Sequence, residues 1–171
     1  MLFRSSGKKF LNHGIGNTIL GGWQLNGIAV FHSGFPLEMT TAVNNLFNYG
    51  GTQRPNWTGQ DPNTNGSMSS RINQYFNPAV FSQPAPYTFC NVGRQLAILR
   101  SPGLANLDLS VFKNFPIHER LKLQFRAEAF NLMNHPQFAP PNTGIGTPSA
   151  GVISAVNNAP RNIQLALKLL F

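Results

Sequence analysis

Four stretches of the chain alternate between apolar and polar residues, and this period of two predicts β-strands rather than helices. In the last stretch, 161–171, one face carries Ile163, Leu165, Leu167, Leu169 and Phe171. The other face is mostly polar and includes Gln164 and Lys168. A domain in water usually ends in a polar tail, whereas a transmembrane β-barrel has strands with one face in lipid and one on a polar lumen. The pattern therefore favours a membrane strand, with the last strand of a soluble β-sandwich as the alternative.

The stretch 121–131 shows the alternation most clearly. Its odd positions from Leu121 to Ala129 are all apolar, and the even positions between them are Lys122, Gln124, Arg126 and Glu128. A helical pattern fits fewer of these positions, although Ala and Glu favour helices. We therefore expect a strand at 121–131, another at 105–114, and a less regular one at about 20–33.

Two long segments, 44–103 and 134–160, are rich in Asn, Gly, Pro, Ser and Thr and are expected to be loops. An irregular segment of about sixty residues is unusual in a compact soluble domain, whereas outer-membrane barrels have long extracellular loops. The first segment contains Phe47, Tyr49, Trp57, Tyr75, Phe76, Phe81, Tyr87 and Phe89. These aromatic rings fit two uses equally well, which are stacking on a sugar or other ligand and packing the loop on itself.

The fold class that follows is all-β, with antiparallel strands of a transmembrane barrel over residues 1–171. If Phe171 lies on the periplasmic side, the strands at 105–114 and 161–171 run inward and the other two run outward. Phe115–Arg120 is then a short periplasmic turn, and both long segments face the outside. This arrangement predicts antiparallel pairing of 105–114 with 121–131.

The composition agrees with a membrane setting. Hydrophobic residues make up 42% of the chain and charged residues only 11%, less than half of the share that is typical of soluble domains. No run approaches the roughly 20 apolar residues of a membrane helix. Since alternating strands do not produce such a run, the composition favours crossing by strands.

The charge and the reactive residues indicate neither a nucleic-acid partner nor an enzyme. The net charge is +8, but the basic residues are scattered and form no basic helix or RNA-binding motif. Cys90 is the only cysteine, so no intramolecular disulfide is possible, and the four histidines lack the spacing of metal ligands. No catalytic triad pattern is present, and we expect no metal or cofactor.

Arg126 and Glu128 lie on the polar face of one predicted strand, two residues apart. They are compatible with a catalytic acid and its partner, but an ion pair facing a barrel lumen is the simpler interpretation. Lys168, on the polar face of the last stretch, is interpreted in the same way, as a lumen-facing residue.

Several motifs resemble one known family. They are GWQLNG at 22–27, FNPAVF at 76–81, LRSPG at 99–103, LDLSVFKNF at 107–115 and LQFRAEAFNLMNH at 123–135. Together they resemble the C-terminal barrel end of TonB-dependent receptors of the Oar-like type, which carry a carboxypeptidase-regulatory-like N-terminal domain. The resemblance covers nearly the whole chain, although Cys90 stands where we would expect Gly.

The resemblance implies a barrel in the cell outer membrane, closed around an N-terminal plug, that takes up a ligand with energy delivered through TonB. It implies that TonB contacts the N-terminal region and that the outer-membrane assembly machinery reads the terminal Phe171. The chain shows no plug, no TonB-binding motif and, at Met1–Phe10, no signal peptide. Four strands are fewer than the roughly eight that closure needs. We therefore expect a fragment that is inactive alone, and the sequence does not identify its ligand.

Overall fold

The structure, a computed structural model, describes residues 21–47, 51–118 and 121–171. The chain divides into two compact units. The first, called the four-strand unit, consists of 21–31, Ala105–His135 and Ala159–Phe171. The second, called the packed-loop unit, consists of His32–Leu104 and Pro136–Asn158. Strands prevail in the described residues, whose helices are too short and too polar to cross a membrane.

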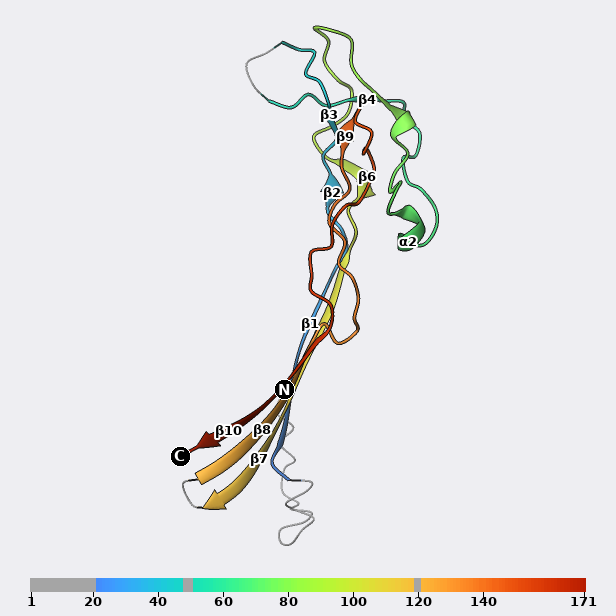
Figure 1. The fold of residues 1–171 in the computed structure, drawn as a ribbon. Coiled ribbons are helices and arrows are strands. Elements are labelled where there is room, and N and C mark those ends of the chain that lie inside the picture. The colour runs from blue at the N-terminus through green and yellow to red at the C-terminus, as the bar shows by residue number, and fades with distance from the viewer. Residues whose placement is uncertain (1–20, 48–50, 119–120) are drawn as a thin grey trace. The chain divides into compact units, whose positions relative to one another are not determined.

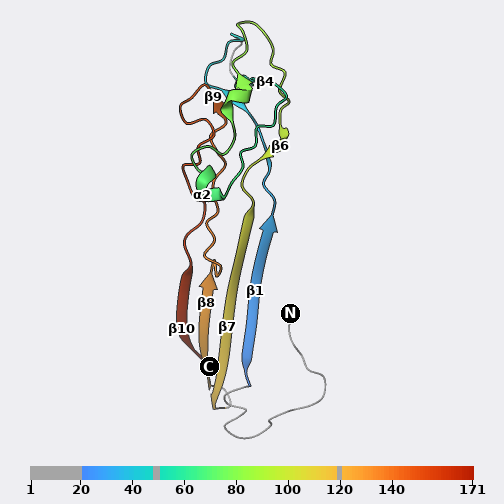
Figure 2. The same ribbon diagram turned by 90° about the vertical axis from the view of Figure 1, so that its right-hand side faces the viewer.

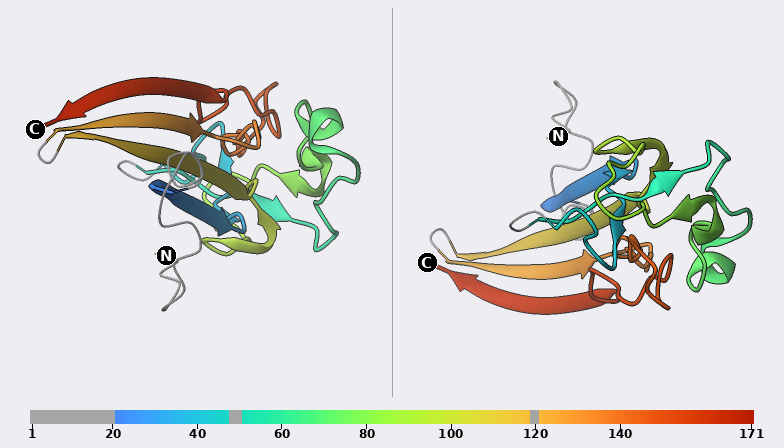
Figure 3. Two further views of the ribbon diagram at one scale, coloured as in Figure 1. Left: turned by 90° about the horizontal axis from the view of Figure 1, so that it is seen from below. Right: turned by 90° about the horizontal axis from the view of Figure 1, so that it is seen from above.

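The four-strand unit is one sheet with the strand order β1-β7-β8-β10 (Figures 1 and 2). Its strands are β1 (Trp23–His32), β7 (Leu104–His118), β8 (Leu121–Phe130) and β10 (Asn162–Leu170). Each lies where the alternating pattern predicted a strand, and the segment at 121–131 is a strand rather than a helix. In Figure 3 the four strands lie next to one another as a single curved layer.

The predicted connector at Phe115–Arg120 is wrong in its extent, because β7 continues to His118. Phe115 pairs with Leu123 and Pro116 pairs with Lys122, and the register shifts only at the following pair. A proline interrupts a strand only where the ladder needs its missing N–H. The Phe-Pro dipeptide therefore marks no turn here, and what remains of the connector lies outside the described residues.

The strand pairing gives the sheet one apolar and one polar face. β7 pairs antiparallel with β8, as predicted, and β8 pairs antiparallel with β10. In both registers, odd residues face odd residues, so that Leu165 lies opposite Ala127 and Gln164 lies opposite Glu128. Residues opposite each other share a face. Most apolar residues of β7, β8 and β10 therefore lie on one face of the sheet, and most of their polar residues lie on the other.

β1 joins the sheet beside β7 and runs in the opposite direction (Figure 2). The Asn114 N–H donates to the Gly22 carbonyl oxygen at 3.1 Å. Gly22 has a φ of 73°, and a Cβ there would lie 2.8 Å from the Asn114 carbonyl oxygen. Only glycine fits this close approach. Within the described residues the sheet ends at β1 on one side and β10 on the other, so it has two edges and is not closed.

The packed-loop unit is not irregular throughout, which corrects the expectation for 44–103 and 134–160. Short strands pair within it: β2 (Pro36–Leu37) with β6 (Leu96–Arg100), β3 (Thr40–Thr41) with β9 (Gly144–Ile145), and β4 (Asn56–Trp57) with β5 (Phe81–Ser82). The β3–β9 pair is parallel, and the other two are antiparallel. One helical turn, α2 (Met68–Arg71), and the 3₁₀ turn η1 (Pro78–Val80) complete it.

A hydrophobic core holds the packed-loop unit together. Its buried members are Leu37, Met39, Tyr75, Phe76, Val80, Phe81, Val92, Leu96, Leu99, Ile145 and Ile153. Phe76 and Phe81 meet edge to face, with ring centroids 6.0 Å apart. Ile145 and Ile153 come from the second of the two long segments, so the core joins segments that are far apart in sequence. Hydrophobic burial of this kind fixes the chain without long strands.

Candidate functional site

The polar face of the four-strand sheet carries the only charged pair that the described residues form. The Arg126 Nη2 lies 2.9 Å from the Glu128 Oε1, and both side chains are about one-quarter to one-third exposed. The Arg126 guanidinium also lies 4.5 Å from the ring centroid of Phe112 on β7. Because the cation contacts both a carboxylate and a ring face, its position on the sheet is well defined.

Amide side chains extend this polar face. Gln124 donates to Asn114 across the β7–β8 pair at 2.9 Å, and Asn106 donates to Asp108 along β7 at 3.0 Å. Lys168 lies opposite Gln124 in the β8–β10 register, on the same face as Arg126 and Glu128. The three residues interpreted as lumen-facing therefore share one face, although their position in a lumen remains a prediction.

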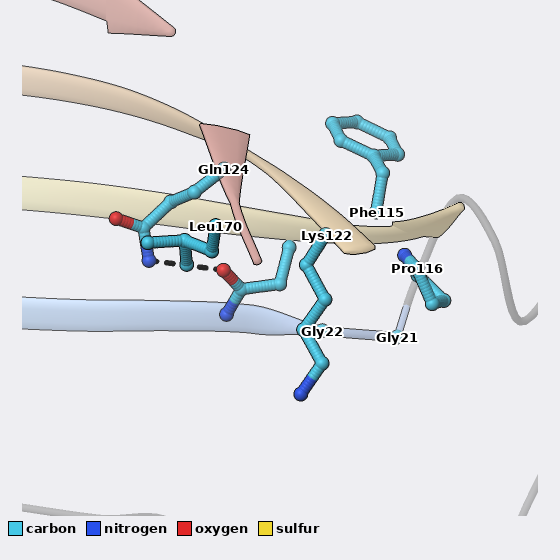
Figure 4. Close-up of a pocket in the computed structure, with 8 residues that line it drawn as sticks. Gly21, Gly22, Phe115, Pro116, Lys122, Gln124 and Leu170 are labelled. Carbon is cyan, nitrogen blue, oxygen red and sulfur yellow. Dashed lines mark hydrogen bonds between the residues drawn. The ribbon is translucent and has the colours of Figure 1, made fainter. Parts of the chain in front are cut away.

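A hollow of about 560 Å³ lies on this face at the end of the strands where β7 leads into β8 (Figure 4). Its lining includes Gly22, Asn114, Pro116, Lys122, Gln124 and Leu170. In Figure 4 the Phe115 ring and the Lys122 side chain extend to opposite sides of the strands. The lining offers amides and one lysine but no carboxylate, hydroxyl or thiol, so it suits binding of a polar group rather than acid–base chemistry.

The apolar face contains one cation, which sequence reasoning missed. Lys113 is only 2% exposed, and its Nζ lies 4.9 Å from the Trp23 ring centroid and 5.4 Å from the Phe115 ring centroid. The ammonium group also donates to the Gly21 carbonyl oxygen. Two ring faces and a carbonyl oxygen thus replace water around a charge on an otherwise apolar surface. The available signal was Lys113 at an odd position, two residues before an aromatic.

The motif around Asn131 links the ends of three strands. Asn131 is buried and has a φ of 50°, and its backbone N–H donates to the Asp108 carboxylate at 2.8 Å. Its side chain donates to the Ala159 carbonyl oxygen at 3.1 Å and accepts from the His135 N–H at 3.0 Å. The family-like motif at 123–135 therefore holds the end of β8 next to β7 and next to the residues that lead into β10.

Phe171 follows the end of β10 and is 99% exposed. The ring packs on nothing within the described residues, so it adds little to the stability of the sheet there. Nothing in the geometry tests its interpretation as an assembly signal.

The aromatic residues of 44–103 divide between the two uses that the sequence left open. Tyr75, Phe76 and Phe81 are buried in the core, and Trp57 packs against it. Phe47, Tyr87 and Phe89 are 67%, 75% and 86% exposed. Tyr49 lies outside the described residues. Packing therefore accounts for the first group, whereas the second group presents its rings to the surroundings.

Two pKa shifts occur in the packed-loop unit, and both have structural causes. Burial raises the pKa of Tyr75, although the Arg71 guanidinium, 4.3 Å from the ring centroid, opposes the shift. The backbone and side-chain N–H groups of Asn63 lower the pKa of Asp61. Neither shift has a nucleophile or a second acid among its causes, so the shifts describe local packing rather than a catalytic pair.

In the described part of the chain, no three His, Cys, Asp or Glu side chains gather as a metal site would require. Cys90 is half-buried, with its Sγ 3.8 Å from the Val92 carbonyl oxygen. The candidate surfaces are therefore the polar sheet face, with its hollow, and the exposed rings of the packed-loop unit.

The sequence matches one family model, described as an outer membrane beta barrel domain, over residues 4–164. The match includes every strand of both units in full except β10, of which it includes Asn162–Gln164. No curated protein and no solved structure matches the chain.

Proposed function

The chain belongs to the outer membrane β-barrel domain family, and on that premise we propose that it is the C-terminal barrel segment of a TonB-dependent receptor for an unidentified ligand. Its location is the outer membrane. The receptor type rests on the resemblance of the motifs at 107–115 and 123–135, which lie in β7, in β8 and in the Asn131 turn.

The observation that carries the barrel role is the division of the four-strand sheet into two faces. Leu165 and Leu167 are each 69% exposed on the apolar face, while Arg126 and Glu128 pair on the polar face. In a soluble β-sandwich a second sheet would cover the apolar face at about 10 Å. The exposure of these side chains does not support the soluble binding module, and lipid is the medium that suits them.

The two sheet edges support the proposal that this segment works only with other strands. Unpaired backbone groups at β1 and β10 would each cost several kcal/mol in lipid. Closure takes at least about eight strands of roughly 9–11 residues, about twice the number in the sheet of the described residues. The remaining strands, the plug and the TonB contact belong to other parts of the proposed receptor, and this segment transports nothing alone.

The chain itself provides a test of the segment proposal after refolding into detergent micelles and lipid vesicles. We expect strand-rich circular dichroism, no heat-modifiable band in gel electrophoresis and no steady conductance, because the sheet cannot close. A heat-modifiable species with steady conductance from this chain alone would contradict the proposal. DNA upstream of Met1 tests the receptor type, because an in-frame continuation encoding further strands and a plug is expected.

We propose further that Phe171 acts in assembly rather than in stability. Burial of one ring at the interface contributes only about 1.5–3 kcal/mol, which is little for a closed barrel. Phe171→Ala in the full-length receptor should lower the amount in the outer membrane more than it lowers the stability of the protein refolded in detergent. Normal cellular yield with this variant would show that the assembly machinery does not read this residue.

A further inference from the structure

Phe47 and Tyr87 form an aromatic platform on the packed-loop unit. Their rings stack with centroids 4.9 Å apart and planes inclined by 28°. Both side chains are more than two-thirds exposed, and neither is a member of the core cluster. The two rings therefore contact each other and the surroundings, whereas the aromatic residues of the core contact many neighbours.

Both residues of the aromatic platform have a left-handed backbone. The φ angles are 55° at Phe47 and 61° at Tyr87. Bulky side chains rarely adopt this region, and the strain persists only where the surrounding structure enforces it. The rings are exposed and fill no core, so burial of these side chains does not explain the strained backbone. Strained residues of this kind concentrate at ligand-contacting sites.

A buried amide fixes the two loops that carry the platform. Gln53 is 3% exposed, and its Oε1 accepts from the Asn45 N–H at 2.8 Å while its Nε2 donates to the Thr88 carbonyl oxygen at 3.3 Å. The Tyr87 N–H donates to the Asn45 carbonyl oxygen at 2.9 Å. Asn45 also donates through its side chain to the Pro84 carbonyl oxygen at 3.1 Å. The rings are thus held in place before any ligand arrives, which lowers the entropic cost of binding.

The chemistry around the platform selects a neutral ligand. The segments 42–47 and 83–89 contain no Lys, Arg, Asp or Glu, although the chain has a net charge of +8. A phosphate-bearing or acidic ligand would require cations beside the rings. The Tyr87 hydroxyl has no hydrogen-bond partner in the part of the chain that the structure describes, and a purely apolar ligand would leave it without one. A neutral sugar meets both conditions, because its C–H face packs on a ring and its hydroxyls hydrogen-bond.

We propose that the platform of Phe47 and Tyr87 is a stacking site for a neutral pyranose ring of an oligosaccharide or polysaccharide. Because the two rings stack on each other, the sugar packs on an outer ring face, and the second ring supports the first from behind. The Tyr87 hydroxyl provides one directional hydrogen bond. This site is independent of the proposed transport role, because it needs only the packed-loop unit and its own core.

Asn substitutions separate binding from folding. Asn tolerates the left-handed region that Phe and Tyr resist, so Phe47→Asn and Tyr87→Asn remove a ring and relieve backbone strain together. The thermal midpoint should stay equal or rise, while the sugar dissociation constant increases about tenfold or more, as loss of one aromatic contact implies. Tyr87→Phe keeps the ring and should weaken binding less. Phe35→Asn is the matched control, because Phe35 is 68% exposed and lies outside the platform.

Binding is measured on the whole chain in amine-oxide micelles, which carry no sugar headgroup. The probes are the neutral hexasaccharides maltohexaose, cellohexaose and laminarihexaose, and polygalacturonate is the acidic comparison. Saturation-transfer NMR and calorimetry should detect binding of at least one neutral probe that both platform variants lose and Phe35→Asn retains. The proposal is overturned if no neutral probe binds, if both Asn variants bind normally, or if polygalacturonate binds more tightly through the same residues. A large fall in the thermal midpoint of the Asn variants also overturns it, since the rings would then serve folding.

Discussion

The two units of this chain differ in where their hydrophobic residues are buried. Every buried residue of the hydrophobic core belongs to the packed-loop unit. Among the described residues of the four-strand unit, the buried positions are Lys113 and Asn131, which are both polar. The same chain therefore contains one region with a core of the kind found in water and one whose apolar groups point outward. In the proposed barrel, lipid would complete the burial of the second region, whereas side chains complete that of the first.

This difference shows why exposure must be interpreted together with the secondary structure. Exposed aliphatic rows such as Leu165 and Leu167 would be an aggregation hazard in water. On paired strands with a polar opposite face they are the expected outer surface of a membrane barrel. Phe47 and Tyr87 are about equally exposed, but they lie on loops with strained backbone and form the aromatic platform.

The largest effect is expected in the core of the packed-loop unit. Phe76 is fully buried, so Phe76→Ala should lower the free energy of unfolding of that unit by about 3–5 kcal/mol. The two tryptophans lie in different units, and Trp57 fluorescence in a Trp23→Phe background reports this unit alone. Denaturant titration of the whole chain in micelles provides the measurement. An unchanged Trp57 midpoint would show that the core does not stabilise this unit.

The faces of the four-strand unit can be tested by charge. Within the proposed full-length receptor, Leu167→Arg should cost roughly 2–4 kcal/mol in lipid, because position 167 belongs to the apolar face. Gln164→Arg should cost much less. Folding into lipid vesicles under a denaturant titration measures both. Equal costs for the two variants would show that the two positions do not differ as proposed, with position 167 facing lipid and position 164 facing the lumen.

The Asn131 turn tests whether polar contacts replace a core in the four-strand unit. Asn131→Ala removes the side-chain bonds to Ala159 and His135 and places Ala at a positive φ, so a loss of about 2 kcal/mol is expected. Asn131→Gly keeps the backbone conformation accessible and should lose less. Trp23 fluorescence in a Trp57→Phe background, during denaturant titration in micelles, measures both. If Ala and Gly give equal losses, the positive φ contributes nothing.

The smallest effect concerns pH and the packed-loop unit. Burial raises the folded-state pKa of Tyr75 above its ordinary value of 10.0, so the unfolded chain releases this proton at lower pH than the folded chain. The stability that results is complete below pH 10 and is lost as pH rises through the folded-state pKa. Denaturant titrations between pH 8 and pH 11 should show this loss at Trp57, and Tyr75→Phe should reduce it. Stability that rises across this range would contradict the assignment.

Local periodicity determined the four-strand unit. An alternation of two residues is a property of the chain alone, so the positions of β8 and β10 and the division of Arg126 from Leu165 followed from the sequence. The end of β7 did not, because pairing with β8 continues past Pro116. The candidate site was likewise predictable only in part. The polar face was predictable, but the position of Lys113 under two rings depends on a neighbouring strand.

Tertiary structure decided the packed-loop unit. Phe76 and Phe47 are the same residue type in the same Asn- and Gly-rich segment, yet the first is buried and the second is exposed. No local pattern distinguishes them, because burial depends on partners such as Ile145 and Ile153 that lie about seventy residues away from Phe76. Contacts across such distances form only when the chain closes a long loop, which costs conformational entropy. The free energy gained in return depends on how all the segments pack together. The sequence by itself therefore determined the strands and their faces, and the packing of distant segments decided which rings formed a core and which remained available for binding.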